Sequence, residues 1–177
     1  MESHNYLDTT KKVFLQYKIM AEDAMAQVTD EQLFWVPSAE SNSIAVIVKH
    51  LWGNMLSRWT NFLTTDGEKD SRDRDAEFIT TDITTRAQLM EKWNEGWKCF
   101  IDCLNSLKPE DLQKIVKIRA EDHTVIDALI RQMAHYSSHI GQIVYLAKAQ
   151  KNEGWKSLSI PRGQSKQFNA KMMGDKK

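Results

Sequence analysis

The segment that decides the fold is "TVIDALIRQMAHYSSHIGQIVYLAK", residues 124–148. Apolar residues recur in it every three or four positions, which is typical of an amphipathic helix with one buried face. Thr124 and Asp127 have the spacing of a capping box, so we expect the helix to begin at Thr124 and to reach about Lys148. The predicted buried stripe contains Ile126, Leu129, Ile130, Met133, Ile140, Val144 and Ala147.

Three earlier segments show the same periodicity. They predict helices at about Tyr6–Val28, Ser43–Thr64 and Arg86–Leu107. Ser43 stands directly before an apolar run, which is the position of an N-cap. The flank of this second helix is small and mildly polar, so we expect the helix to be buried on more than one side. Four long helices and no strand-rich region predict an all-α fold, a four-helix bundle.

The connection between the second and third helices, residues 66–85, is unusually long. Its mixed charges most simply indicate a solvated, irregular loop, although a loop of this length in a compact domain also suggests a function. It can span the height of the bundle. Two helix orders are therefore possible, simple alternation and the up-down-down-up order, which we favour. We expect residues 114–123 to form a short extended or irregular link, and residues from about 150 to form an irregular tail.

The composition limits the class of protein. A chain of 177 residues fits a single domain, 1–177, and its formal net charge of zero gives no overall basic field for nucleic acid or a membrane. No apolar run approaches the ~20 residues of a membrane span, and the N-terminus lacks the features of a signal peptide. These features predict a soluble, cytoplasmic protein. Cys99 and Cys103 most simply are small apolar residues, and a redox pair or thiolate metal site is the alternative.

His135 and His139 lie four residues apart in the last predicted helix. Residues at this spacing share a helix face, with Cβ atoms about 5–6 Å apart, so two imidazoles could bind one ion. The pair alone is weak evidence, because helical histidines often only satisfy a hydrogen bond. The residue after the first histidine is Tyr136 instead of the glutamate of the zincin motif, so a metalloprotease is not supported.

A third ligand would make the site more credible, and His50 can supply it. If the second and fourth helices are antiparallel, His50 reaches the level of His135 and His139 within about one turn. His123 lies about 18 Å along the same helix axis from His135, and His4 lies near the terminus, so we expect neither to take part. Three histidines with an open position are typical of catalytic sites and suit a divalent transition metal such as zinc or nickel.

Other residues could shape a pocket beside this site. Gln142 could fix the tautomer of an imidazole or orient a substrate, but it could equally face solvent. Arg58 and Arg131 could bind a substrate carboxylate with two hydrogen bonds, although salt bridges are the commoner role of arginines. The tryptophans are core residues by default, and one of them could line an apolar pocket. They are Trp52, Trp59, Trp93 and Trp97.

The segments "SIAVIVKHLWGNMLSRWTNFLTTDGEK" and "RQMAHYSSHIGQIVYLAK" resemble the DinB-like (DinB/YfiT-like) superfamily, in a bacterial branch of uncharacterised function. The resemblance covers about residues 6–160. It implies a four-helix bundle in which a divalent metal, nickel or zinc, is held by three histidines. The ligand of the family's second helix falls on His50, and the pair of its last helix falls on His135 and His139.

Some members of that superfamily are thiol S-transferases that use bacillithiol, mycothiol or glutathione, and members often form dimers. The resemblance therefore implies a metal-dependent enzyme acting on a small molecule, as a thiol S-transferase or with hydrolase-like chemistry. The alternative is a non-enzymatic protein, a dimeric metal-binding or stress-related interaction protein. We expect a homodimer, because the apolar surface of the second helix exceeds what one core needs.

Overall fold

The computed structural model describes residues 2–174 of the chain, with side chains from residue 5 onward. Long helices dominate the described residues, so the protein is mostly helical. They are α1 (Glu2–Met25), α3 (Ile44–Trp59), α4 (Arg86–Ser106) and α5 (Val125–Lys151). The shorter elements are α2 (Asp30–Phe34), η1 (Ala76–Phe78), η2 (Pro109–Asp111), β1 (Ile115–Ile118), β2 (Glu121–Thr124) and α6 (Ser165–Gly174). Within the described range, no helix is long and apolar enough to cross a membrane.

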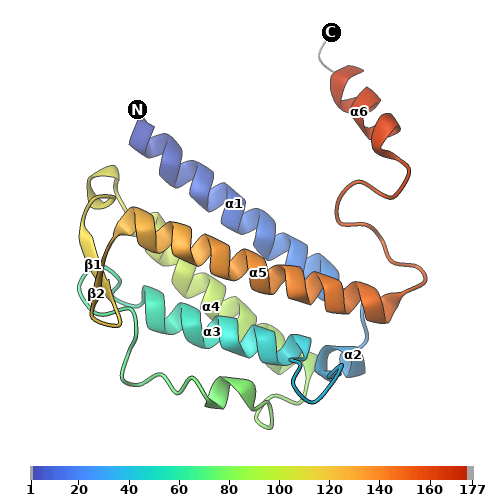
Figure 1. Ribbon diagram of the computed structural model, residues 1–177, viewed down its shortest axis with the longest axis horizontal. Helices are drawn as coiled ribbons and strands as arrows, with labels where there is room; N and C mark the ends of the chain where they lie inside the picture. The colour runs from blue at the N-terminus through green and yellow to red at the C-terminus, as the bar shows by residue number, and fades with distance from the viewer. Residues whose placement is uncertain (1, 175–177) are drawn as a thin grey trace.

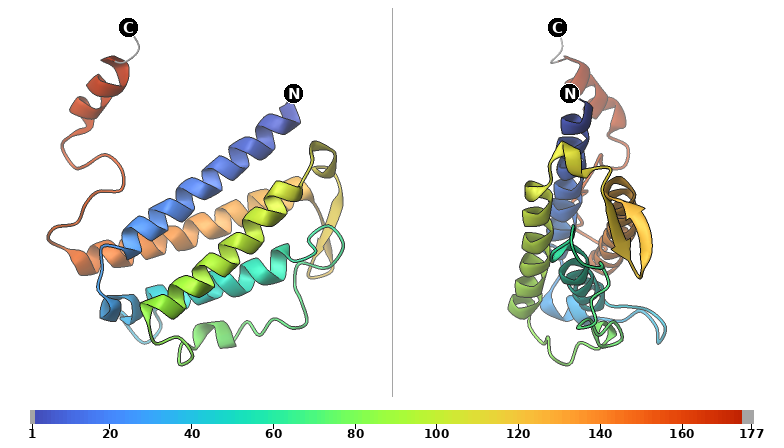
Figure 2. Two further views of the ribbon diagram at one scale, coloured as in Figure 1. Left: turned by 180° about the vertical axis from the view of Figure 1, so that it is seen from behind. Right: turned by 90° about the vertical axis from the view of Figure 1, so that its left-hand side faces the viewer.

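The long helices lie side by side and run in two directions. Figure 1 shows α3 and α4 running in one direction and α1 and α5 in the other, so α3 and α5 are antiparallel. The segment between α3 and α4 returns along α3 from its C-terminal to its N-terminal end and carries η1 (Figure 2). This return is what lets α4 begin at the same end as α3. It also lays a loop against the outer side of α3.

The helix starts follow local capping chemistry. The Thr124 hydroxyl accepts a hydrogen bond from the Asp127 backbone N–H at 3.0 Å, and the Asp127 carboxylate accepts one from Thr124 N–H at 3.1 Å. The predicted capping box is therefore confirmed, as is the Ser43 N-cap, whose hydroxyl accepts from Val46 N–H at 3.1 Å. Both caps satisfy donors that the first helical turn leaves unpaired.

Helix α3 ends at Trp59 instead of continuing to the predicted Thr64. Thr60 is extended, and Asn61 adopts a left-handed conformation with φ of 51°. Asparagine tolerates this conformation better than most residues, so the chain turns there instead of continuing the helix. The prediction that α3 is buried on more than one side is confirmed, because α4, α5 and η1 all pack against it.

Each long helix contributes an aromatic residue to the core. The ring of Phe100 in α4 lies 4.5 Å from that of Phe14 in α1, 4.6 Å from Trp59 in α3 and 5.5 Å from Tyr136 in α5, measured between centroids. Aromatic side chains bury much apolar area and favour such tilted and edge-to-face contacts. This cluster holds α3 and α5 at the separation that the site described below requires.

The predicted stripe of α5 was wrong in part. Ile130 is 56 % exposed, whereas Gln132 and Tyr136 are buried. These two polar side chains can be buried because they are hydrogen-bonded. The Tyr136 hydroxyl accepts from Trp59 Nε1 at 2.9 Å and donates to Asn54 Oδ1 at 3.2 Å. The Gln132 amide donates to the same Asn54 oxygen. A stripe defined by apolar residues alone leaves out such positions.

Two segments that were predicted to be irregular contain regular structure. The link predicted at residues 114–123 contains an antiparallel hairpin, in which Ile115 pairs with Thr124 and Ile118 with Glu121. Arg119 and Ala120 form its turn with φ of 55° and 64°, and two such residues match the right-handed twist of the strands. The tail predicted to be irregular contains α6, which stands apart from the other helices (Figure 1). Residues 175–177 of that predicted tail lie outside the described residues.

Candidate metal centre

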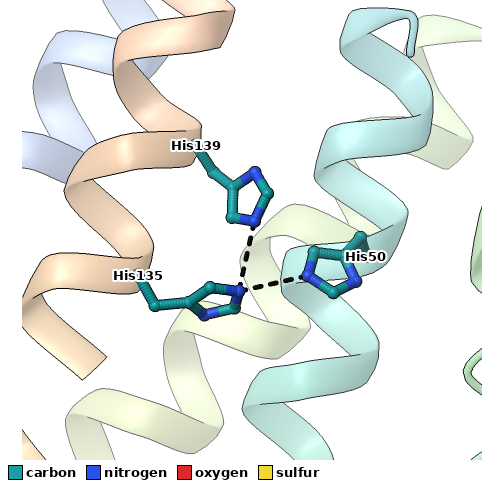
Figure 3. Close-up of side chains that lie close together, drawn as sticks. All are labelled: His50, His135 and His139. Carbon is teal, nitrogen blue, oxygen red and sulfur yellow. Dashed lines mark hydrogen bonds between the residues drawn. The ribbon is translucent and has the colours of Figure 1, made fainter. Parts of the chain in front are cut away.

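Three histidines from two helices converge at one point. His50 extends from α3, and His135 and His139 extend from successive turns of the antiparallel α5 (Figure 3). The Nε2 atom of His135 lies 3.2 Å from Nε2 of His50 and 3.1 Å from Nε2 of His139. The ligand atoms of all three side chains lie within 4.8 Å of one another, so the cluster could hold a metal ion.

Two of the separations between these nitrogens match a tetrahedral ion. Imidazole ligands at ~2.0–2.1 Å from zinc, at tetrahedral angles, place their nitrogens about 3.3–3.4 Å apart. The 3.1 and 3.2 Å contacts differ from this geometry by only a few tenths of an ångström. These two separations fit a tetrahedral transition-metal ion, and the ligand atoms of the third pair, His50 and His139, lie within 4.8 Å of each other.

Each imidazole is also held from its outer side. His50 Nδ1 lies 2.8 Å from a Glu77 oxygen, and His139 Nδ1 lies 3.0 Å from Gln142 Oε1. His135 Nδ1 contacts the side-chain amide of Gln132 at 3.1 Å. His50 and His139, which donate Nδ1–H to an oxygen, keep the lone pair on Nε2, as metal-binding histidines do. His135 differs, because its Nδ1 accepts from the Gln132 amide and its Nε2 carries the proton, which it must lose to bind an ion. Gln142 thus occupies the tautomer-fixing position that the sequence suggested.

Burial keeps His135 and His139 neutral. It lowers the pKa of His135 to about 3, and the neighbouring charges of His139 and His50 act in the same direction. Burial also lowers the pKa of His139, although the hydrogen bond to Gln142 opposes it. A metal ligand must be a neutral imidazole, so near pH 7 these two rings are in the form that can bind an ion.

Sequence reasoning missed Glu77, which the long loop places beside His50. This carboxylate is 3 % exposed, and Arg72 donates to it twice, from Nε at 2.7 Å and from Nη2 at 2.9 Å. Burial by itself raises the pKa of Glu77, but the hydrogen bonds from His50 and Arg72 outweigh it and leave the pKa below its ordinary value. The ionised Glu77 therefore accepts the Nδ1 proton of His50.

Gly53 makes room for this carboxylate. A Cβ atom at position 53 would lie 2.2 Å from Glu77 Oε1 and 2.8 Å from its Cδ. Gly53 is one turn after His50 on the same helix face, and a glycine within an apolar helix often marks the close approach of another group. It was the available sequence signal for a missing neighbour of His50. Phe78, next to Glu77, stacks on the His50 ring at 5.7 Å between centroids.

A cavity of about 510 Å³ opens beside the cluster. All three histidines line it, and so do Arg58 and Arg131, the two arginines that the sequence indicated. Its aromatic wall is Phe78, and no tryptophan belongs to the described lining. Three of the tryptophans are core residues, and Trp52 faces a second cavity under the long loop. The default expectation that the tryptophans are core residues is therefore confirmed for three of the four, and the alternative that one lines the pocket beside the histidines is not borne out.

The other candidates whose side chains are described lie away from the cluster. His123 is on β2, with Glu121 as its charged neighbour at 3.8 Å, and takes no part in the site, as predicted. His4 lies outside the residues whose side chains are described. Cys99 and Cys103 pack against the core as free cysteines, and burial raises the pKa of Cys103 to about 12. They fit the simpler interpretation as apolar residues.

One protein-family model matches most of the chain. The model of a family described as "Protein of unknown function (DUF1572)" matches residues 1–164. The chain belongs to the DUF1572 family. No curated protein matches this DUF1572 chain.

Proposed function

We propose that this DUF1572 protein is a metal-dependent enzyme that acts on a small molecule. The observation that carries the proposal is the convergence of three histidine Nε2 atoms at the wall of a cavity of about 510 Å³. A structural metal site is usually closed by four protein ligands. Here three ligands lie beside a space large enough for a substrate, which favours catalysis over a purely structural role.

We further propose that the fold is a four-helix bundle of the DinB/YfiT-like type with up-down-down-up order. The directions of α1, α3, α4 and α5 support this order, as does the long return of the chain along α3. The placement of His50 on α3 and of His135 and His139 on α5 supports the likeness to that superfamily. These three residues then correspond to its ligands.

We propose zinc or nickel as the ion, because imidazole nitrogen suits both, whereas magnesium and calcium prefer oxygen. When bound, the ion would supply a Lewis-acidic centre that lowers the pKa of a thiol or a water molecule beside it. The chain's own residues do the rest. Glu77 and Gln142 hold the imidazoles in orientation, and Phe78 shields one face of His50 from water.

The proposed reaction is S-transfer from a low-molecular-weight thiol to an electrophile. The sulfur forms a bond to the electrophilic carbon, the leaving group departs with its electron pair, and the thiol proton is released to solvent. The alternative within the same site is hydrolysis, in which water replaces the thiol. The non-enzymatic alternative, a metal-binding protein that acts through dimerisation, gives the cavity no role.

The test uses protein loaded with zinc or nickel and monochlorobimane as the electrophile. Bacillithiol, mycothiol and glutathione are supplied separately, and fluorescence reports conjugation. We expect one thiol to be conjugated faster than in the absence of protein, and the rate to fall to background in His139→Ala. The variant His123→Ala, which alters a histidine outside the cluster, should keep the rate. Failure of the loaded protein with every thiol would contradict S-transfer.

A further inference from the structure

The cavity beside the histidines is lined by positive charge. Five arginines contribute to its wall, from α3, the long loop, the hairpin turn and α5, and its described lining contains no carboxylate. They are Arg58, Arg72, Arg74, Arg119 and Arg131. The formal charge of the whole chain is zero, so this accumulation of positive charge is local. It contrasts with the mixed charges of the remaining surface.

Two of these arginines have carboxylate partners. Arg72 is bound by Glu77 and Glu68, and Arg119 lies 3.4 Å from Glu68. Among the residues that the structure describes, Arg58, Arg74 and Arg131 have no carboxylate oxygen within 4.0 Å. The partners present therefore neutralise only part of the charge around the cavity.

Arg58 is the most unusual of the three. It is 4 % exposed, and its Nε and Nη1 atoms are buried without a hydrogen-bond partner among the described residues. Burial lowers its pKa, while the charges of Tyr136 and Glu68 oppose this change and those of Arg131 and Arg72 add to it. A buried guanidinium without a counter-ion is costly, so a residue of this kind is expected where a ligand supplies the missing anion.

The surroundings are built to hold Arg58 in this position. A Cβ atom at Gly67 would lie 2.7 Å from Arg58 Nη1 and 2.9 Å from its Cδ, so glycine leaves the space that the guanidinium needs. The neighbouring Asp66 accepts hydrogen bonds from the backbone N–H groups of Arg119 at 2.9 Å and Ala120 at 2.7 Å. These bonds fasten the hairpin turn to the loop and so bring Arg119 to the cavity.

We propose that this cavity binds an oxyanion group of the substrate, a carboxylate or a phosphate, through Arg58 and Arg131. The inference rests on the proposed function, because it places the anion beside the same three histidines and thereby gives the substrate class, an anionic small molecule. Guanidinium groups donate paired hydrogen bonds to both kinds of anion. The anion would fix one end of the substrate while its reacting atom faces the histidines.

The test measures binding of inorganic phosphate and of succinate by calorimetry, at constant ionic strength, to metal-free and zinc-loaded full-length protein. Arg58→Met removes the buried charge but keeps much of the volume, and Arg131→Gln removes an exposed one. The matched control is Arg162→Gln, which removes an exposed arginine from the tail. Zinc stoichiometry is measured for every variant.

We expect at least one of the two anions to bind both forms of the protein. Arg58→Met should raise the dissociation constant at least about tenfold and Arg131→Gln several-fold, while Arg162→Gln leaves it unchanged. Zinc stoichiometry should stay the same in all of them. Arg58→Met should also unfold at a higher temperature than the wild type when no anion is present, because it removes an unpaired buried charge.

The two proposals can fail separately. Zinc binding without binding of either anion would overturn the oxyanion site and leave the metal site standing. Anion binding that is unaffected by Arg58→Met would also overturn the oxyanion site, because the anion would then be held elsewhere, for example by the bound zinc ion. Arg58-dependent anion binding in a protein that takes up no metal would support the oxyanion site and contradict the metal-dependent function.

Discussion

At the scale of single residues, Glu77 determines how His50 can act. It accepts the Nδ1 proton of His50 and is itself bound by Arg72, so the imidazole keeps its Nε2 lone pair directed at His135. No pattern in the loop sequence reveals this, because Glu77 stands in a mixed-charge segment of ordinary solvated composition. Its burial depends on Gly53 and Arg72, which are distant from one another in sequence.

We predict that Glu77→Gln lowers zinc affinity by about 10- to 100-fold, because outer partners of metal-binding histidines contribute this much. The amide keeps the shape of the side chain but is a weaker acceptor for the His50 proton. Competition with a chromophoric chelator measures the affinity. Glu68→Gln is the control, since Glu68 also pairs with Arg72 but is not a hydrogen-bond partner of the histidines. Equal losses in both variants would show that Glu77 acts only through Arg72.

At the scale of elements, the site depends on the contact between α3 and the loop that returns along it. The capping residues and apolar periodicity of the long helices could be read from the sequence, because both depend on neighbours within four or five residues. Three other features could not be read from the sequence: the hairpin, the end of α3 at Trp59 and the burial of Gln132. Burial of Gln132 depends on Asn54, and the Arg119–Ala120 turn is bound by Asp66, partners far away in sequence. The end of α3 depends on the left-handed conformation of Asn61, within an apolar pattern that continues to Phe62.

We predict that Gly53→Ala lowers zinc affinity even though alanine favours a helix. The added Cβ would lie 2.2 Å from Glu77 Oε1, so the carboxylate would be displaced from His50. Gly141→Ala is a matched control on α5, where nothing lies within 4 Å of the added atom. It should stabilise the protein by about 0.5–1 kcal/mol and leave zinc affinity unchanged. Unchanged affinity in Gly53→Ala would contradict the assigned role of Gly53.

At the scale of the whole molecule, the three histidines come together because α3 and α5 are antiparallel and share an aromatic core. The sequence predicted this convergence from the levels of the residues along two helices. It indicated Arg58 and Arg131 as pocket residues, but it predicted neither the loop that covers His50 nor the other three arginines around the cavity, which come from that loop and the hairpin turn. Local patterns do not report which distant loops share a cavity.

The stability of the metal-free protein should depend on pH through His135. Its pKa is about 3 in the folded protein and about 6.5 in an unfolded chain. Between these values the unfolded state binds more protons, so the free energy of unfolding should fall as the pH drops below 6.5 and should not change from this source above it. Urea unfolding at pH 5 and pH 7.5 measures the difference. His135→Asn should show a smaller difference in the free energy of unfolding between the two pH values. A difference equal to that of the wild type would contradict the assignment of this pH dependence to His135.

The homodimer stays a prediction. The apolar residues of α3 that suggested it are covered within the chain itself. Exposed apolar side chains are instead found on α5, where Ile130 is 56 % and Tyr145 74 % exposed. Light scattering at micromolar concentration should give twice the mass of the 20.5 kDa chain. A clean monomer mass would contradict the prediction.

The central claim is that His50, His135 and His139 together bind one transition-metal ion, and the most direct measurement is the metal content of protein purified without an affinity tag. We predict about one zinc or nickel ion per chain in the wild type and in His123→Ala, which changes a histidine outside the cluster. His50→Ala should lose most of its metal affinity, because two imidazoles alone hold such an ion weakly. Full stoichiometry and unchanged affinity in His50→Ala would contradict the three-histidine site.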